Sequence, residues 1–143
     1  MEFEGKVWKD GKFWLVEVPA LNVMTQGKTK KECLEIAEAA VLGLIECYFK
    51  SEIDEDFSIS IDDQQNGVIG ITSSNTKLLL ALSLKRQRKK SGSTVREASE
   101  RLGSKSLNAY AQYEKGRTSI SLDKYEALLI AANPSEPRRL RIA

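Results

Sequence analysis

Histidine is absent from this 143-residue sequence, and cysteine is scarce. Without histidine the chain has no imidazole acid or base, cannot form a serine or cysteine triad, and lacks nearly every familiar zinc-ligand spacing. The two cysteines, Cys33 and Cys47, fall on one predicted helix, whose rise of about 1.5 Å per residue separates them by about 21 Å. That separation excludes a disulfide within the chain. We therefore expect reduced, packed thiols and a reducing compartment.

Long apolar runs are also missing. The longest, Leu78 to Leu84, includes Ser83 and is far shorter than the roughly 18 residues that a membrane span requires. The first residues, Met1 to Glu4, are acidic and lack the basic and apolar regions of a secretion signal. We therefore expect a cytoplasmic protein with no membrane partner. No residue pattern in the sequence indicates a cofactor.

The net charge of +2 is the sum of two very different parts. Residues 1–75 contain 7 Lys/Arg and 14 Asp/Glu, a net charge of −7, whereas residues 76–143 contain 15 and 6, a net charge of +9. An acidic part joined to a basic part indicates two partners of opposite charge. A polyanion is the expected partner of the basic part.

The first half of the chain has the pattern of an antiparallel sheet. Alternating apolar residues predict strands over residues 3–9, 12–18, 57–61 and 68–72. Asp10-Gly11 and Asn66-Gly67 predict tight hairpin turns, the first of type I′, because such turns need positive φ. Pro19 should end the second strand, since proline cannot continue a ladder of hydrogen bonds.

One long helix is predicted between the strand pairs, over residues 29–49, because apolar residues recur there at three- and four-residue steps. Thr29 and Glu32 have the spacing of a capping box at its start. The order ββ(β)αββ predicts an α+β domain with one helix packed on a face of the sheet.

Acidic residues cluster at 54–56 and 62–63. Carboxylate clusters can hold the divalent metal of a nuclease. Both clusters are predicted to lie in turns between strands, where solvated acidic runs are common. We therefore expect no metal site, no catalytic residues and no enzyme, and we keep a nuclease dependent on Asp62 or Asp63 as an alternative.

Three segments of the first half carry a family signature. They are residues 14–21 (WLVEVPAL), 24–29 (MTQGKT) and 31–34 (KECL). They resemble the amino-terminal signature of HicB-type antitoxins, which have a strand ending in Pro-x-Leu, a Thr-Gln-Gly turn and a Thr-capped helix. The resemblance implies a degenerate RNase H-like fold without nuclease activity, which covers a small toxin ribonuclease.

The toxin implied by that resemblance binds RNA and should present a basic surface. The charge of −7 on the first half suits such a partner, because complementary charge speeds encounter and sets orientation. The candidate toxin-binding residues surround the Pro-x-Leu segment: Trp14, Glu17, Leu21 and Met24. Trp14 and Leu21 are alternatively residues of the core.

The second half of the chain is predicted to be helical. The expected helices span residues 76–90, 95–102, 107–115 and 122–132. Thr94 and Glu97 form a second capping box, Ser106 and Ser121 are helix caps, and Gly103 turns the chain. Two short helices joined by a glycine turn predict an all-α helix-turn-helix domain.

The residues of these helices also resemble known sequences. Residues 94–103 (TVREASERLG) resemble the second helix of the Cro and phage-repressor class, and residues 113–116 (YEKG) resemble its Tyr-Glu-Arg-Gly ending. Residues 101–116 look like the version carried by HicB antitoxins. Val95 and Ser99 depart from the glutamine and alanine usual in the class, which puts backbone contacts to DNA there in doubt.

The third helix is the expected recognition helix. If Leu107, Tyr110 and Tyr113 point into the core, the opposite face can read base edges in the major groove. The predicted base-reading residues are Lys105, Asn108, Ala109 and Gln112. The predicted phosphate contacts lie at helix ends, at Thr94, Ser106, Lys115 and Arg117.

Together these patterns predict a toxin-binding domain at 1–74, a DNA-binding domain at 75–134 and a mobile basic tail at 135–143. The implied function is an antitoxin that neutralises a HicA-like toxin ribonuclease and represses its own operon by binding operator DNA. A homodimer or higher even oligomer is expected, because one recognition helix reads only a half-site. The main alternative is a stand-alone helix-turn-helix regulator with a ligand-sensing first domain.

Overall fold

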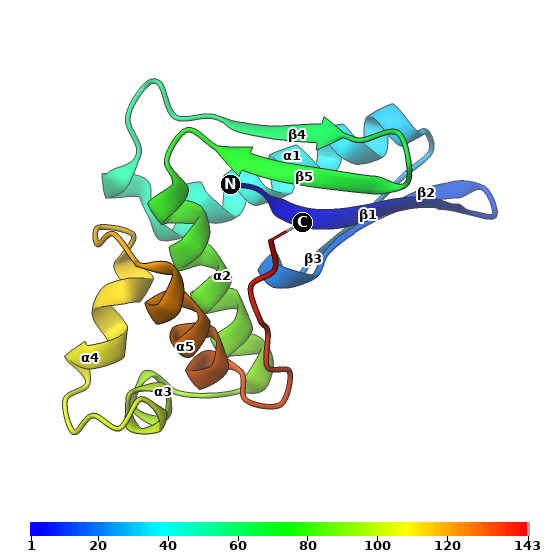
Figure 1. Ribbon diagram of the computed structural model, residues 1–143. Coiled ribbons are helices and arrows are strands. Elements are labelled where there is room, and N and C mark those ends of the chain that lie inside the picture. The colour runs from blue at the N-terminus through cyan, green and yellow to red at the C-terminus, as the bar shows by residue number, and fades with distance from the viewer. Residues whose placement is uncertain (143) are drawn as a thin grey trace.

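The computed structural model describes residues 1–142 of the chain. The first part is a five-stranded, fully antiparallel sheet in the order β3-β2-β1-β5-β4 (Figure 1). Its strands are β1 (Phe3–Asp10), β2 (Phe13–Val18), β3 (Val23–Gly27), β4 (Ile59–Asp63) and β5 (Val68–Ser73). The predicted antiparallel sheet is therefore confirmed. The third strand, which the predicted order ββ(β)αββ gives as optional, is present as β3. We call residues 1–74 the sheet unit.

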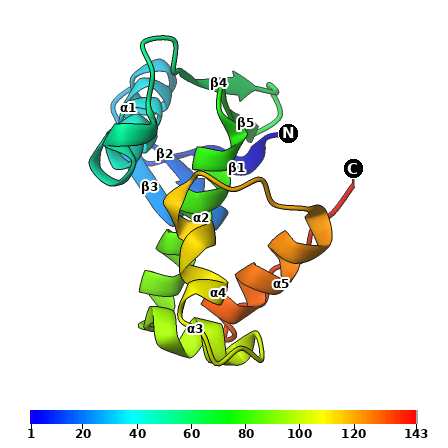
Figure 2. The same cartoon turned by 90° about the vertical axis from the view of Figure 1, so that its left-hand side faces the viewer.

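One long helix, α1 (Lys30–Tyr48), packs on one face of the sheet (Figures 1 and 2). Thr29 is its N-cap, and the hydroxyl oxygen accepts the backbone N–H of Glu32 at 3.1 Å. The Glu32 carboxylate accepts the N–H of Lys28 at 2.8 Å, so the return bond of the predicted capping box lies one residue earlier than expected. The buried face repeats every four residues, at Cys33, Ala37, Val41 and Ile45.

The first hairpin has a different turn from the predicted one. Asp10 pairs with Phe13, so the loop consists of Gly11 and Lys12, and of these two only Gly11 has positive φ, at 60°. Glycine with positive φ at the first loop position is the pattern of a type II′ turn. The turn is therefore shifted by one residue from the predicted Asp10-Gly11 pair.

The second hairpin joins β4 to β5 through a longer loop, in which Gln65 and Gly67 have positive φ of 62° and 83°. The strand before it begins later than predicted and includes Asp62 and Asp63, so the placement of these residues in a turn is wrong. Asp63 forms an ion pair with Lys30 of α1 at 2.7 Å, and the Lys30 ammonium lowers the pKa of its carboxyl. This pair ties the edge strand to the helix.

Residues 25–27 form the end of β3, although the resemblance implies a turn there. At Gly27 the strand approaches the start of α1 so closely that a Cβ would lie 2.7 Å from the backbone nitrogen of Cys33. Glycine is required here by this close approach of two backbones.

The second part of the chain, residues 75–134, is the helical unit. Its elements are α2 (Thr76–Ser91), α3 (Val95–Arg101), α4 (Asn108–Ala111), the 3-10 turn η3 (Gln112–Lys115) and α5 (Leu122–Ala132). Asn75 caps α2, Gly92 ends it with φ of 71°, and Ser121 caps α5 as predicted. The third predicted helix is shorter than expected, because only α4 is α-helical and the last turn tightens to η3.

Helix α2 lies between the two units. All seven residues from Leu78 to Leu84 are buried, on every side of the helix, because the sheet unit and α5 cover opposite sides. The core residues of both units form one continuous apolar cluster. Within the described residues 1–142, no helix is long and apolar enough to cross a membrane.

Two side chains of α2 bind the short 3-10 helix η1 (Pro19–Leu21), which follows β2 and ends that strand as Pro19 predicts. Arg86 donates to the carbonyls of Leu21 and Asn22, at 3.0 and 2.6 Å. The buried Gln87 amide donates to the carbonyls of Pro19 and Ala20, at 2.9 and 3.0 Å. Four successive carbonyls of the sheet unit are therefore held by α2.

The basic tail follows α5 and runs back towards β1 (Figure 1). Glu136 forms an ion pair with Lys90 of α2 at 3.1 Å, and the N–H of Leu140 donates to Glu126 of α5 at 3.0 Å. The tail therefore contacts the helical unit through Glu136 and Leu140.

Candidate DNA-binding site

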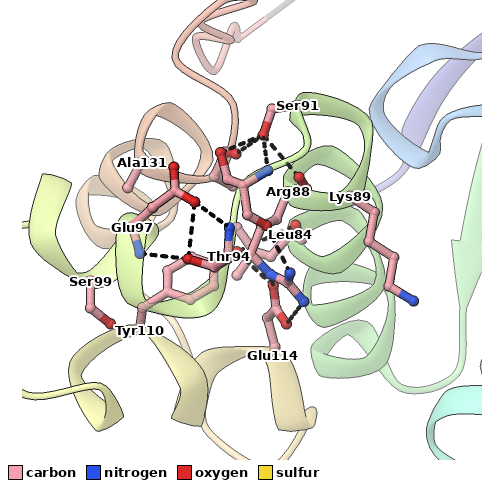
Figure 3. Close-up of polar contacts among 12 residues, drawn as sticks. Leu84, Arg88, Lys89, Ser91, Thr94, Glu97, Ser99, Tyr110, Glu114 and Ala131 are labelled. Atoms are coloured by element: carbon pink, nitrogen blue, oxygen red, sulfur yellow. Dashed lines mark hydrogen bonds and ion pairs between the residues drawn. The ribbon is translucent and has the colours of Figure 1, made fainter.

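The site begins at α3, which opens with a complete capping box (Figure 3). The Thr94 hydroxyl oxygen accepts the Glu97 N–H at 3.1 Å, and the Glu97 carboxylate accepts the Thr94 N–H at 3.2 Å. The hydrogen bonds from Thr94 hold the pKa of the Glu97 carboxyl below its ordinary value. A helix of seven residues thus gains a fixed start, as the spacing predicts.

The turn after α3 is stabilised by glycine and serine. Gly103 has φ of 79°, which confirms the predicted glycine turn. Ser99 is buried, and its hydroxyl donates to the carbonyl of Leu107 at 3.0 Å. The serine at this unusual position therefore ties α3 to the start of the recognition segment, by which we mean residues 105–115.

A buried ion pair holds the end of the recognition segment against α2 (Figure 3). The Arg88 guanidinium donates to both carboxylate oxygens of Glu114, at 2.6 and 3.0 Å, and also to the carbonyl of Ser93 at 3.0 Å. The Glu114 carboxylate raises the pKa of Arg88, so the guanidinium stays charged. This geometry fixes the distance between the recognition segment and the scaffold helix.

Tyr110 completes the same network from the middle of the segment. Its hydroxyl donates to Glu114 at 2.8 Å, and burial raises the pKa of the phenol. The segment then ends at Gly116, with φ of 75° and a Cβ position that would lie 2.6 Å from Leu78 Cδ2. The Tyr-Glu-x-Gly sequence therefore supplies a buried carboxylate and, two residues later, a glycine in a left-handed conformation that other residues rarely adopt.

The polar face predicted for base reading points outward. Lys105, Asn108 and Gln112 are exposed, and Ala109 is partly buried. The opposite face is only partly as predicted: Tyr110 is fully buried and Tyr113 packs against the core. Leu107 is 45% exposed, so its assignment to the core is wrong. Leu107 lies in the turn before α4, and its carbonyl accepts the hydrogen bond from the Ser99 hydroxyl. Its side chain adds an apolar group to the exposed surface.

The four predicted phosphate contacts are all exposed, but their surroundings differ. Lys115 ends η3. The prediction that Ser106 caps the third helix is wrong, because α4 has Leu107 as its N-cap with no side-chain cap bond. The Ser106 oxygen instead accepts the Asn108 N–H at 3.2 Å. Thr94 is occupied by the capping box. Arg117 forms an ion pair with Glu52 of the sheet unit at 2.5 Å, so a phosphate would have to replace that carboxylate.

The four candidate toxin-binding residues do not share one surface. Leu21 is completely buried under α2. Trp14 packs against the core, and the Lys30 ammonium lies 6.0 Å from the centre of its ring. Both residues therefore follow the core alternative. Glu17 and Met24 are directly opposite each other on β2 and β3 and point away from α1.

Sequence reasoning missed the polar residues that position the site. Arg88 falls in the basic run of α2 and reads as a solvent-exposed charge, whereas its partner Glu114 is 26 residues away. Arg101 likewise donates to Ser93 and to the carbonyl of Ala131, at 2.7 and 2.8 Å. The Tyr-Glu-x-Gly match was the available signal, because a glutamate between a tyrosine that packs against the core and a glycine at the end of the segment indicates an internal role.

The acidic clusters of the sheet unit have no metal-binding arrangement. Throughout residues 1–142, no group of three or more cysteine or carboxylate side chains is placed to hold a metal ion. Asp63 is instead paired with Lys30, and Asp62 is exposed on the edge strand.

Residues 84–133 match the Helix-turn-helix family, of the Cro/C1 type. The match runs from the middle of α2 to the residue after α5 and contains the whole network described above. No curated protein matches the chain. This part of the protein is therefore a DNA-binding helix-turn-helix region, and it binds double-stranded DNA as transcription regulators of this class do.

Proposed function

We propose that the protein is a HicB-type antitoxin that neutralises a HicA-like toxin ribonuclease and represses its own operon. The observation that carries the DNA-binding half is the exposed row of Lys105, Asn108 and Gln112 on a segment fixed from behind by Arg88 and Glu114. Asparagine and glutamine pair with adenine through two hydrogen bonds, and lysine pairs with guanine. Side chains held on a rigid element can make such contacts at low entropic cost.

Repression would use two copies of the chain, because a single short recognition segment covers one half-site. Leu122 and Ile130 are exposed on α5, eight residues apart on one side of the helix, and Glu126 lies between them. Two exposed apolar side chains on one side of α5 support pairing of two helical units through this helix. The homodimer is part of the proposal.

The neutralising half rests on the signature of residues 14–34 and on the charge of the sheet unit. An acidic sheet unit suits a toxin that uses a basic surface to bind RNA. Neutralisation would be steric, since a protein seated on that surface excludes the RNA.

Operator binding tests the first half of the proposal. In Asn108→Ala and Gln112→Ala variants, we expect the affinity for the operator to fall by about 1 to 3 kcal/mol per lost bidentate contact, with little change on unrelated DNA. Lys115→Gln is the matched contrast: it should weaken binding to all sequences and reduce the salt dependence by about one unit of slope. Fluorescence anisotropy with promoter fragments and scrambled duplexes measures both. An equal loss on every sequence from Asn108→Ala and Gln112→Ala would assign base reading to another face.

Co-expression tests the second half. The full chain should restore growth to cells that express the small protein encoded beside it, and the Asn108→Ala/Gln112→Ala variant should do so equally well. Failure of the full chain to protect would remove the antitoxin function and leave the transcription regulator.

The two alternatives have less support. A ligand sensor needs an apolar pocket with a few polar groups. The hollow at the junction of the units is instead lined mainly by polar residues, among them Glu52, Asp54 and Asp56. A nuclease needs a metal held by several carboxylates, and Asp63 is already neutralised by Lys30. The discriminating result would be metal-dependent cleavage that Asp62→Asn abolishes.

A further inference from the structure

The sheet has a second face, opposite to α1, which we call the outer face. Residues that lie directly across neighbouring antiparallel strands point to the same side, and successive residues alternate. Lys6 is opposite Glu17, which is opposite Met24, and the same register places Trp8 opposite Leu15. The apolar residues of the outer face are Trp8, Phe13, Leu15, Met24 and Val68.

These five apolar residues are not part of the protein's core. None of them belongs to the continuous apolar cluster of residues 1–142 or packs against it, in contrast to Trp14 and Ile61 on the inner face. Met24 is 61% exposed and Phe13 is 40% exposed. In Figures 1 and 2, α1 covers the other side of the sheet. Partly or fully exposed apolar residues on a sheet face whose other side already has a core indicate an interaction surface.

Acidic side chains surround the patch. Among its strand residues, the outer face carries four acidic side chains, Glu4, Asp10, Glu17 and Asp62, and one lysine, Lys6. Two copies of this face brought together would place like charges opposite each other, which disfavours association. A basic partner would gain both apolar burial and complementary charge.

From this geometry we propose that the outer face is the docking surface for a basic, RNA-binding protein partner. The inference rests on the proposed function and names the surface that performs it. Met24 and Glu17 both belong to this surface, whereas Trp14 and Leu21 support the sheet from inside. The partner's basic surface would cover β1, β2 and β3, with Met24 and Leu15 buried at the centre and Glu17 at the rim.

The test uses the purified full chain and, as the probe, the small protein encoded beside it. Met24→Asp and Phe13→Asp should each weaken the complex at least about thirtyfold in calorimetry, because a buried apolar contact is replaced by an unpaired charge. Ile36→Asp is the matched control. Ile36 lies on the exposed side of α1 with an exposure of 39%, close to that of Phe13, so this variant should bind as the unchanged chain does.

Charge provides an independent measurement on the same face. Glu17→Lys should lower the association rate constant about threefold at low salt, with a smaller effect at high salt, because encounter is steered by charge. Circular dichroism melting confirms that each variant is folded.

Three outcomes would overturn the proposal in different ways. If the unchanged chain does not bind the probe, the antitoxin function fails and the docking surface with it. If the unchanged chain binds and Met24→Asp and Phe13→Asp bind equally well, only the assignment of the surface fails. If these two variants keep the probe but separate an oligomer into single chains in light scattering, a second copy occupies the face.

Discussion

The sheet unit and the helical unit are each stabilised from within by a different kind of interaction. The buried polar or charged side chains of residues 1–142 are all in the second half, at Ser83, Gln87, Ser93, Ser99, Glu114 and Asn133. The sheet unit has none, because alternating apolar residues and α1 close its inner face completely. Charge differs in the same way, with −7 in residues 1–75 and +9 in residues 76–143.

This difference follows from the lengths of the elements. A sheet satisfies its backbone groups along the whole ladder, whereas each short helix leaves several N–H and C=O groups free at both ends. Helices α3 and α4 have seven and four residues, too few for stability on their own. Side chains such as Ser99 and Arg101 donate to free carbonyls of the helical unit. The side-chain pair of Arg88 and Glu114 adds directional contacts that fix where the recognition segment lies.

Breaking the buried ion pair should have the largest effect. Arg88→Met leaves the Glu114 carboxylate buried without its partner, and we expect the free energy of unfolding to fall by about 3 kcal/mol. The lower end of the range for buried pairs applies because the Arg88 side chain keeps an exposure of 14%. Urea denaturation followed by circular dichroism measures the loss, and operator affinity should fall with it.

Two further variants give this prediction its controls. Lys90→Met removes a charge from the same helix, but its pair with Glu136 is at the surface, so the loss should stay below about 1 kcal/mol. Arg88→Met/Glu114→Leu should regain most of the stability, because no charge remains buried. If Arg88→Met and Lys90→Met lowered the free energy of unfolding equally, the buried ion pair would not stabilise the helical unit in particular. The contrast with the sheet unit, which is stabilised by apolar packing, would then be lost.

The sequence predicts those features that depend on neighbouring residues. Alternation located β1, β2 and β5 closely and β4 two residues early, but it gave no bounds for β3. The cap at Ser121 located α5 to the residue. The exposed row of Lys105, Asn108 and Gln112 also follows from local spacing. The short last turn of the recognition segment was missed, because nothing in the local pattern separates an α-helix from a 3-10 turn.

Features that depend on distant residues were not predictable in this way. The sequence leaves open whether Leu21 is a toxin-binding residue or a core residue. The structure shows that α2 covers it and that Arg86, 65 residues later, donates to its carbonyl. The four toxin-binding candidates were chosen by their distance along the chain from Pro19. The register of β2 with β3 is what separates Glu17 and Met24 from the two that face inward.

Glycine substitutions should change the free energy of unfolding by intermediate amounts. One variant in each unit allows a direct comparison of the two units. Gly27→Ala places a Cβ against the Cys33 backbone, which cannot move without α1, and Gly116→Ala meets the flexible end of Leu78 at a positive φ. We expect losses of about 1 to 3 kcal/mol for the first and about 1 to 2 kcal/mol for the second. Gly43→Ala meets no atom within 4 Å on α1 and should stabilise by about 0.5 to 1 kcal/mol.

Thermal unfolding measures all three glycine variants, and DNA binding tells the units apart. Gly116→Ala should weaken operator binding, because it displaces the end of the recognition segment. Gly27→Ala should leave operator binding unchanged at temperatures where the protein is folded. Weakened operator binding by Gly27→Ala would mean that the sheet unit controls the position of the recognition segment through α2.

The smallest effect is expected at the Lys30–Asp63 pair, the polar contact between α1 and the edge strand. Because the folded-state pKa of Asp63 is lowered, the pair stabilises the fold above the unfolded-state pKa of about 4 and is lost as the pH falls through the folded-state value. Asp63→Asn should therefore destabilise by less than about 1 kcal/mol near neutral pH, and the difference from the unchanged chain should vanish in acid. Urea denaturation between pH 7 and pH 3 measures it. A difference that persists in acid, or that exceeds the loss from Arg88→Met, would place a decisive polar contact in the sheet unit and contradict the division drawn between the two parts of the molecule.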